Sequence, residues 1–85
     1  MTVAYSKAFI KQAKKLSPDL RKRLQDSIKL FCNNPLNPTL RNHALKGKYK
    51  EYRSIDITGD MRALYLQQDD RSIFDAVGTH SQLYG

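Results

Sequence analysis

The sequence predicts an α+β fold in which a short N-terminal strand and a helical hairpin precede a three-stranded antiparallel meander. Apolar residues recur every three or four positions between residues 9 and 32, and they alternate with polar residues between residues 49 and 77. Prolines and asparagines within residues 33–38 separate the two patterns. At 85 residues the chain has room for one core, so we expect one domain over residues 1–85 and a sheet of about four strands.

The N-terminal region predicts a strand followed at once by a helix. Thr2-Val3-Ala4-Tyr5 is a β-prone run and predicts a short edge strand. Ser6 is a good N-cap for a first helix. The apolar side chains of that helix fall at helical spacing, at Phe9, Ile10, Ala13 and Leu16.

Ser17-Pro18-Asp19 predicts the start of a second helix. It combines a capping hydroxyl, a proline at the first helical position and an acid near the positive end of the helix dipole. The apolar stripe of this helix lies at Leu20, Leu24, Ile28 and Phe31, and Cys32 extends it. Two amphipathic helices joined at residues 17–18 predict a helical hairpin.

The second half of the chain predicts the meander. Residues 39–48 are expected to be irregular, and the period then changes to two. Strands are predicted at Tyr49–Ile57, Met61–Gln67 and Ser72–Val77, with turns between them. One face is expected to pack on the helices through Ile55, Ile57, Leu64, Leu66, Phe74 and Ala76. The opposite, open face or its rim is left for Arg53, Asp56, Asp60, Arg62 and His80.

The formal charge of +7 is unevenly distributed along the chain. Residues 1–53 hold 13 lysines and arginines against 3 acids, whereas residues 54–85 hold 2 arginines against 5 aspartates. The field of the first part favours a polyanion such as RNA, although an acidic protein partner would satisfy it equally. A single cysteine excludes an internal disulfide, and no apolar run approaches the length of a membrane span. We therefore expect a cytoplasmic protein.

The residue types point to proton-transfer chemistry. No metal-site or phosphate-loop pattern occurs, and we expect no cofactor. RNA supplies its own nucleophile, the 2′-hydroxyl. An RNA-cleaving enzyme therefore needs only to take that proton, protonate the departing 5′-oxygen and stabilise the charged phosphorane with cations. His80 directly follows the third predicted strand and precedes Tyr84 by four residues, and imidazole is suited to move protons near neutral pH.

Three segments together resemble a known group of toxins. Residues 52–65, YRSIDITGDMRALY, are similar to the strand–turn–strand signature of the RelE/ParE toxin superfamily, in which an arginine precedes the turn and Gly-Asp-x-Arg follows. Residues 43–47, HALKG, and residues 78–85, GTHSQLYG, resemble the YafQ branch. That branch has a His-x-Leu-x-Gly motif and a Gly-Thr-His-x-x-Leu-aromatic-Gly ending.

The resemblance implies a RelE-like fold and the toxin of a type II toxin–antitoxin system. Such a toxin cleaves mRNA on the ribosome, and a cognate acidic antitoxin neutralises it in a hetero-oligomer. The resemblance implies four candidate catalytic residues, which are His80, Asp60, Asp56 and His43. We assign His80 as the general acid and Asp60 or Asp56 as the base, which acts through His43. Asp56 stands where the branch typically has a histidine, and Met61 where a tryptophan can occur. The RNA- or phosphate-binding candidates are Arg53, Arg62, Tyr84, Lys46 and Lys48.

Other interpretations of the same residues stay open. The two arginines of the meander can pair with Asp56 and Asp60 across strands, which would hold the open face in shape without a ligand. Asp60 is also an ordinary turn residue. A ParE-like toxin acting on DNA gyrase would leave His80 without a catalytic task. A basic module that binds nucleic acid or an acidic protein would do the same.

Overall fold

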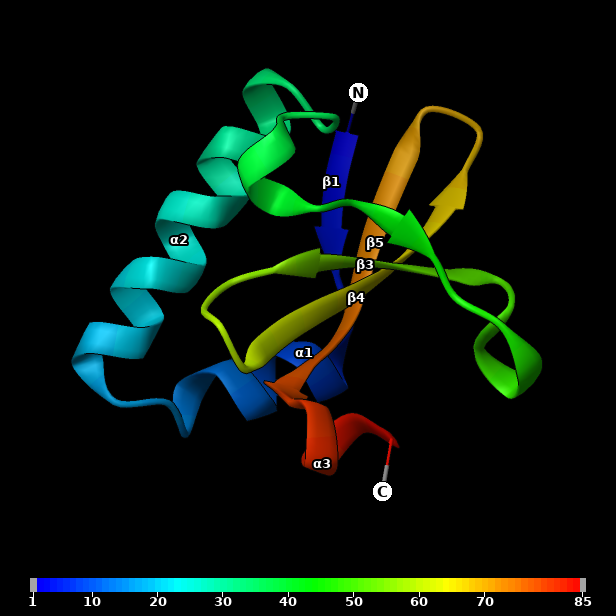
Figure 1. Ribbon diagram of the computed structural model, residues 1–85. Coiled ribbons are helices and arrows are strands. Elements are labelled where there is room, and N and C mark those ends of the chain that lie inside the picture. Colours follow the sequence, from blue (N-terminus) through cyan, green and yellow to red (C-terminus); the bar gives the residue numbers. More distant parts are fainter. Residues whose placement is uncertain (1, 85) are drawn as a thin grey trace.

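The structure is a computed structural model that describes residues 2–84, and it combines one sheet with helices (Figure 1). Met1 and Gly85, which belong to the predicted domain and to the terminal motif, lie outside the described residues. The strands are β1 (Thr2–Tyr5), β2 (His43–Ala44), β3 (Tyr52–Asp56), β4 (Met61–Gln68) and β5 (Arg71–Thr79). The α-helices are α1 (Lys7–Lys14), α2 (Pro18–Asn33) and α3 (His80–Tyr84), and short 3₁₀ helices occupy Pro38–Leu40 and Gly47–Tyr49.

The sheet has five strands in the order β1-β5-β4-β3-β2. The predicted α+β class, the edge position of β1 and the meander of β3, β4 and β5 are confirmed. The sheet has one strand more than the four or so that were expected, and it is mixed rather than wholly antiparallel. β1 pairs with β5 in parallel, because the helical hairpin separates β1 from the meander and lets the last strand return beside it. The two residues of β2 add a fifth strand that is too short to show a period.

Both helices of the hairpin begin at the predicted serines. The Ser6 hydroxyl accepts a hydrogen bond from the backbone N–H of Phe9, and the Ser17 hydroxyl accepts one from Leu20. Figure 1 shows α1 and α2 on one side of the sheet and α3 at the end of β5. Cys32, predicted on the buried stripe, is exposed, because it lies beside the stripe rather than on it. No helix within residues 2–84 is long and apolar enough to cross a membrane.

The hydrophobic core lies between the hairpin and one face of the sheet. Phe31 of α2 is fully buried and contacts the rings of Tyr65 and Phe74 edge-on, with centroids 4.9 and 5.2 Å away. Such aromatic contacts combine a large buried area with a defined geometry. The other buried members of the core are Phe9, Leu24, Leu40, Ile55, Ile57, Met61, Ala63 and Val77.

The prediction that Leu64, Leu66 and Ala76 face the helices is wrong. Ala63 and Tyr65 belong to the core, so Leu64 between them lies on the opposite face, where it pairs with Ala76. Leu64 is nevertheless only 2% exposed. Apolar side chains therefore occupy both faces of β4, and alternation alone does not identify the face that the helices cover.

Tyr52 stabilises an irregular point of the sheet. The register shifts at Asp75, which no residue of β4 opposes, and the Tyr52 hydroxyl donates a 2.7 Å hydrogen bond to the Asp75 carboxylate. This bond, with partial burial, raises the pKa of Tyr52 above its ordinary value of 10.0. Tyr52→Phe is expected to cost about 1 kcal/mol of the free energy of unfolding at pH 8. The pKa of Tyr52 is higher in the folded state than in the unfolded state. The stability that the Tyr52 hydroxyl contributes is therefore fully present below about pH 10 and is lost as the pH rises through the folded-state pKa. Urea unfolding at pH 8 and pH 11 measures it.

Candidate active site

A pocket of about 340 Å³ lies on the face of the sheet opposite the hairpin. We call it the His43–His80 pocket. Strands β3 and β4 form its floor, the segment from residue 41 to residue 49 forms one wall, and α3 forms the other. Its lining residues are Arg41, His43, Leu45, Lys46, Tyr49, Ser54, Asp56, Arg62, His80 and Tyr84.

Strand register determines which side chains meet on the floor. Ser54 and Asp56 lie two residues apart on β3 and therefore point to the same face. Arg62 of β4 is the cross-strand partner of Asp56, and His43 of β2 is the cross-strand partner of Ser54. The antiparallel ladder thus brings the pair Asp56–Arg62 and the pair Ser54–His43 together from segments that are far apart in the sequence.

Asp56 is held between two guanidinium groups. Its Oδ1 lies 3.0 Å from Nε of Arg62, and its Oδ2 lies 3.5 Å from Nη1 of Arg41. Nη1 of Arg62 also donates hydrogen bonds to the carbonyls of Thr58 and Gly59 in the β3–β4 turn. Two cations against one carboxylate leave an excess positive charge, and the half-buried Arg62 is fixed in direction. This arrangement suits a phosphate group.

The two histidines occupy opposite walls of the pocket. His80 is the first residue of α3, its backbone N–H donates to the Asp60 carbonyl, and its ring lies 4.8 Å from that of Tyr84. Nδ1 of His43 is 2.8 Å from the Arg41 carbonyl oxygen. A carbonyl only accepts hydrogen bonds, so Nδ1 carries the proton and Nε2 of the neutral ring keeps a free lone pair. His43 can therefore accept a proton at Nε2.

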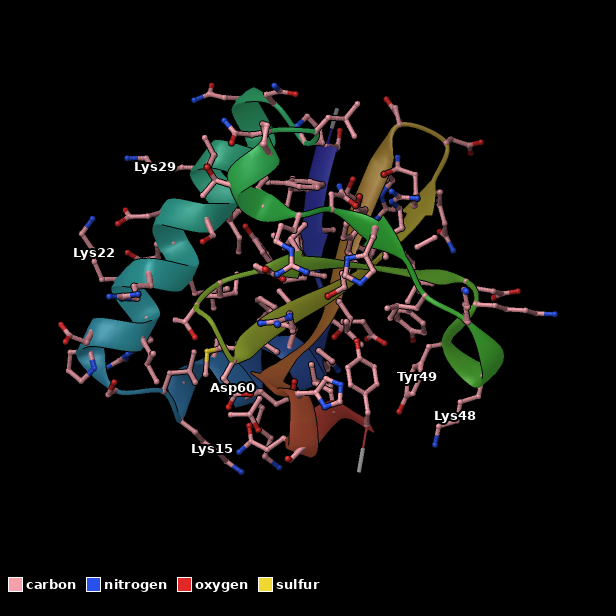
Figure 2. The ribbon with its side chains drawn as sticks, in the orientation of Figure 1. Lys15, Lys22, Lys29, Lys48, Tyr49 and Asp60 are labelled. Carbon is pink, nitrogen blue, oxygen red and sulfur yellow. The ribbon has the colours of Figure 1, made fainter. Side chains whose placement is uncertain are left out.

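The structure brings most, but not all, of the predicted site residues together. His80, Asp56, His43, Arg62, Tyr84 and Lys46 line the pocket. Asp60 is exposed at the start of β4 (Figure 2), and it contributes its carbonyl to His80 rather than its carboxylate to the lining. Lys48 lies over the ring of Tyr49, 5.3 Å from its centroid, and Figure 2 shows it pointing away from the sheet. Among residues 2–84, no group of three or more His, Cys, Asp or Glu side chains is placed to hold a metal ion.

The predicted position of Arg53 on the open face is wrong. Arg53 is the cross-strand partner of Tyr65, a core residue on the helix side of the sheet. Its Nε donates to the side-chain oxygen of Asn42, whose amide nitrogen donates to the Tyr65 hydroxyl. Arg53 and Ser54 are consecutive on β3, so only one of them can face the pocket, and that residue is Ser54.

Sequence reasoning missed Arg41, Tyr49 and Ser54 as residues of the site. Arg41 adopts the left-handed conformation with φ 47°, which a sequence does not reveal for arginine. Tyr49, labelled in Figure 2, joins the two walls of the pocket. Its hydroxyl donates a 2.9 Å hydrogen bond to the Leu83 carbonyl in α3, and its ring packs on Tyr84 at 5.4 Å.

Tyr49→Phe is expected to loosen α3 while the ring contact with Tyr84 persists. The variant loses one hydrogen bond to the helix that carries His80, so we expect a fall of about tenfold in the turnover rate and little change in substrate affinity. Single-turnover cleavage at several substrate concentrations separates these two quantities. Tyr5→Phe, which alters an exposed tyrosine outside the pocket, is the control.

Comparison with known proteins identifies the group to which the chain belongs. The family model described as "Bacterial toxin of type II toxin-antitoxin system, YafQ" matches residues 1–85. The chain belongs to this YafQ toxin family. The mRNA interferase toxin YafQ of Escherichia coli (strain K12) is 35% identical in an alignment 83 residues long, which covers 95% of this chain and 88% of that protein.

Solved YafQ structures share the fold of this family member. The crystal structure of YafQ from E. coli strain BL21(DE3) has a TM-score of 0.83 at 28% identity and covers 98% of this chain and 97% of its own. YafQ in the E. coli DinJ–YafQ toxin–antitoxin complex has a TM-score of 0.80 at 28% identity, over 98% of this chain and 96% of its own. The predicted RelE-like architecture of the YafQ branch is thereby confirmed.

Proposed function

We propose that this YafQ-family toxin is an endoribonuclease that cleaves mRNA positioned on the ribosome. The observation that carries the proposal is the placement of both histidines in one pocket with the Arg41–Asp56–Arg62 cluster. Two proton-transfer groups and a surplus of cations are what cleavage by the 2′-hydroxyl of RNA requires. The mRNA interferase activity named for the E. coli relative supports the same reaction.

Each side chain has a task in the reaction. Nε2 of His43 takes the proton of the ribose 2′-hydroxyl, and the oxygen attacks the adjoining phosphorus. His80, in its protonated form, gives a proton to the 5′-oxygen as the bond from phosphorus to that oxygen breaks. Arg62 and Arg41 stabilise the charge that builds up on the phosphorane. The products are a 2′,3′-cyclic phosphate and a 5′-hydroxyl.

Asp56 orients the arginines in this proposal and is not the base. Both of its carboxylate oxygens already contact a guanidinium, Oδ1 that of Arg62 and Oδ2 that of Arg41, so the carboxylate serves to hold the two cations. Asp60 acts through its backbone, since its carbonyl accepts the His80 N–H and helps to set the start of α3. We therefore propose His43 as the general base, in place of the aspartate that the sequence analysis assigned to this role.

The rest of the surface suits a ribosome-bound substrate. Lys22 and Lys29 point outward from α2, on the side away from the pocket, and Lys15 lies near the start of that helix (Figure 2). A basic surface of this kind binds RNA phosphates with strong salt dependence. The ribosome supplies a pre-oriented mRNA to the small pocket. The location that goes with these proposed partners is the cytoplasm.

A cognate antitoxin is the second proposed partner. The related E. coli YafQ forms a toxin–antitoxin complex with DinJ. The excess of positive charge on the chain, +7 in total, matches an acidic antitoxin segment, and the two proteins would form a hetero-oligomer.

The test is cleavage of a defined mRNA by purified toxin, with and without ribosomes. We expect cuts only when ribosomes are present, and we expect the fragments to carry 2′,3′-cyclic phosphate and 5′-hydroxyl ends, read by end-specific labelling. Intact mRNA together with inhibited DNA gyrase would favour the ParE-like alternative. Salt-sensitive binding without any cut would favour a basic binding module.

A further inference from the structure

Ser54 carries a buried hydroxyl that has no hydrogen-bond partner. The residue is 1% exposed, and its Oγ is the one enclosed side-chain oxygen or nitrogen within residues 2–84 that is left unpaired. Buried polar groups in native proteins are almost always paired, because an unpaired group gives up water on folding and gains nothing in return. The hydroxyl therefore has its full capacity to donate and accept hydrogen bonds with a ligand.

Ser54 lies on the floor of the His43–His80 pocket. It is the cross-strand partner of His43 and precedes Asp56 by two residues on β3. A two-residue step along a strand spans about 6.6 Å. A phosphate bound against the two arginines would direct the ribose joined to it through the 3′-oxygen toward Ser54 and the imidazole of His43, which lie next to the cluster on the same floor.

We propose that the Ser54 hydroxyl binds the ribose 2′-hydroxyl that attacks the scissile phosphate and holds it in front of His43. The inference rests on the proposed function and names a further substrate contact of the same site. Rotation about χ1 turns a serine hydroxyl among three staggered positions. The oxygen thus leaves its enclosed position and pairs with a ribose that fills the pocket.

Ser72 provides a matched comparison. It is as buried as Ser54, with 0% exposure, but its hydroxyl donates a 2.7 Å hydrogen bond to Oε1 of Gln67. Ser72 lies on β5 and does not line the pocket. Comparing Ser54→Ala with Ser72→Ala therefore distinguishes the loss of an unpaired hydroxyl in the pocket from the loss of a paired hydroxyl outside it.

The first measurement is thermal unfolding of the free toxin. Ser54→Ala removes a hydroxyl whose burial nothing offsets, so we expect the melting temperature to rise by about 4 °C or more. Ser72→Ala removes a hydroxyl that donates to Oε1 of Gln67, so we expect the melting temperature to fall. A fall with Ser54→Ala would show that the free toxin already uses this hydroxyl, and it would overturn the proposal.

The second measurement is binding to ribosomes programmed with an mRNA whose cut site has been mapped with the wild-type toxin. A His80→Ala background keeps this mRNA intact. Adding Ser54→Ala is expected to weaken binding about tenfold, whereas adding Ser72→Ala should leave binding unchanged. A 2′-deoxyribose at the cut site should abolish the effect of Ser54→Ala, because the partner of the hydroxyl is gone.

The outcomes distinguish this contact from the proposed function. Unchanged affinity with Ser54→Ala, or the same loss on the ribose and deoxyribose mRNAs, overturns the proposal while ribosome-dependent cleavage stands. A wild-type toxin that cuts no mRNA overturns the proposed function, and the Ser54 contact with it.

Discussion

Replacing His80 with alanine is expected to lower the rate of mRNA cleavage by about 10²–10⁴-fold. The variant loses the imidazole that we propose protonates the departing 5′-oxygen, while α3 keeps its backbone hydrogen bond to the Asp60 carbonyl. Primer extension on translated mRNA, under single-turnover conditions, measures the rate. Substrate affinity is expected to change far less, because His80 acts in the transition state.

Ser81→Ala is the matched control for this prediction. Ser81 is the exposed next residue of α3 and does not line the pocket, so its loss should leave the rate unchanged. Melting temperatures of both variants show whether the fold persists. A His80→Ala protein that cuts mRNA at the wild-type rate contradicts the assignment of His80 as the general acid.

Replacing Arg62 with methionine is expected to lower the cleavage rate by about 10²–10³-fold and to destabilise the fold by about 1–3 kcal/mol. The rate falls because the better fixed of the two guanidiniums no longer faces the phosphate. The stability falls because the Asp56 carboxylate, whose side chain is 15% exposed, keeps only the 3.5 Å contact with Arg41. Cleavage kinetics and urea unfolding measure the two effects separately.

Two variants place limits on the role of Arg62. Arg62→Lys keeps the charge but not the planar fork that reaches both Asp56 and the turn carbonyls, so we expect it to recover part of the stability and little of the rate. Arg71→Met changes an exposed arginine of β5 outside the pocket and should alter neither quantity. A cleavage rate in Arg62→Met that equals that of the wild type would remove the guanidinium from the mechanism.

Local signals were enough to predict α1, α2 and the three strands of the meander, although β3 begins at Tyr52 rather than at Tyr49 and α3 was not predicted. The serine caps, Pro18 and the 3.6-residue apolar stripe specify the hairpin without reference to the rest of the chain. The turn residues between β3 and β4 specify an antiparallel pair in the same way. Pairings between distant segments were harder, because the parallel contact of β1 with β5 leaves no mark on either strand.

The site was predictable as a set of residue types but not as a geometry. His43, Asp56, Arg62 and His80 followed from chemistry and from resemblance, and the pocket contains all four. Arg53 shows that a sequence alone does not decide which face of the sheet a strand residue lies on. Arg53 lies on the face that the helices cover, and this is seen only from its pairing with Tyr65 on β4. The ion pair of Asp56 with Arg41 likewise involves a left-handed conformation at Arg41 that no pattern predicts.

The pairing of β1 with β5 also bears on when a newly made chain becomes harmful. β1, at Thr2–Tyr5, is made well before β5, the strand at Arg71–Thr79 beside which it lies. A nascent chain therefore cannot pair β1 in its sheet or position α3 until β5 has been made. We expect a chain that is interrupted before Arg71 to cut no mRNA, because it lacks both the partner strand of β1 and the helix that carries His80.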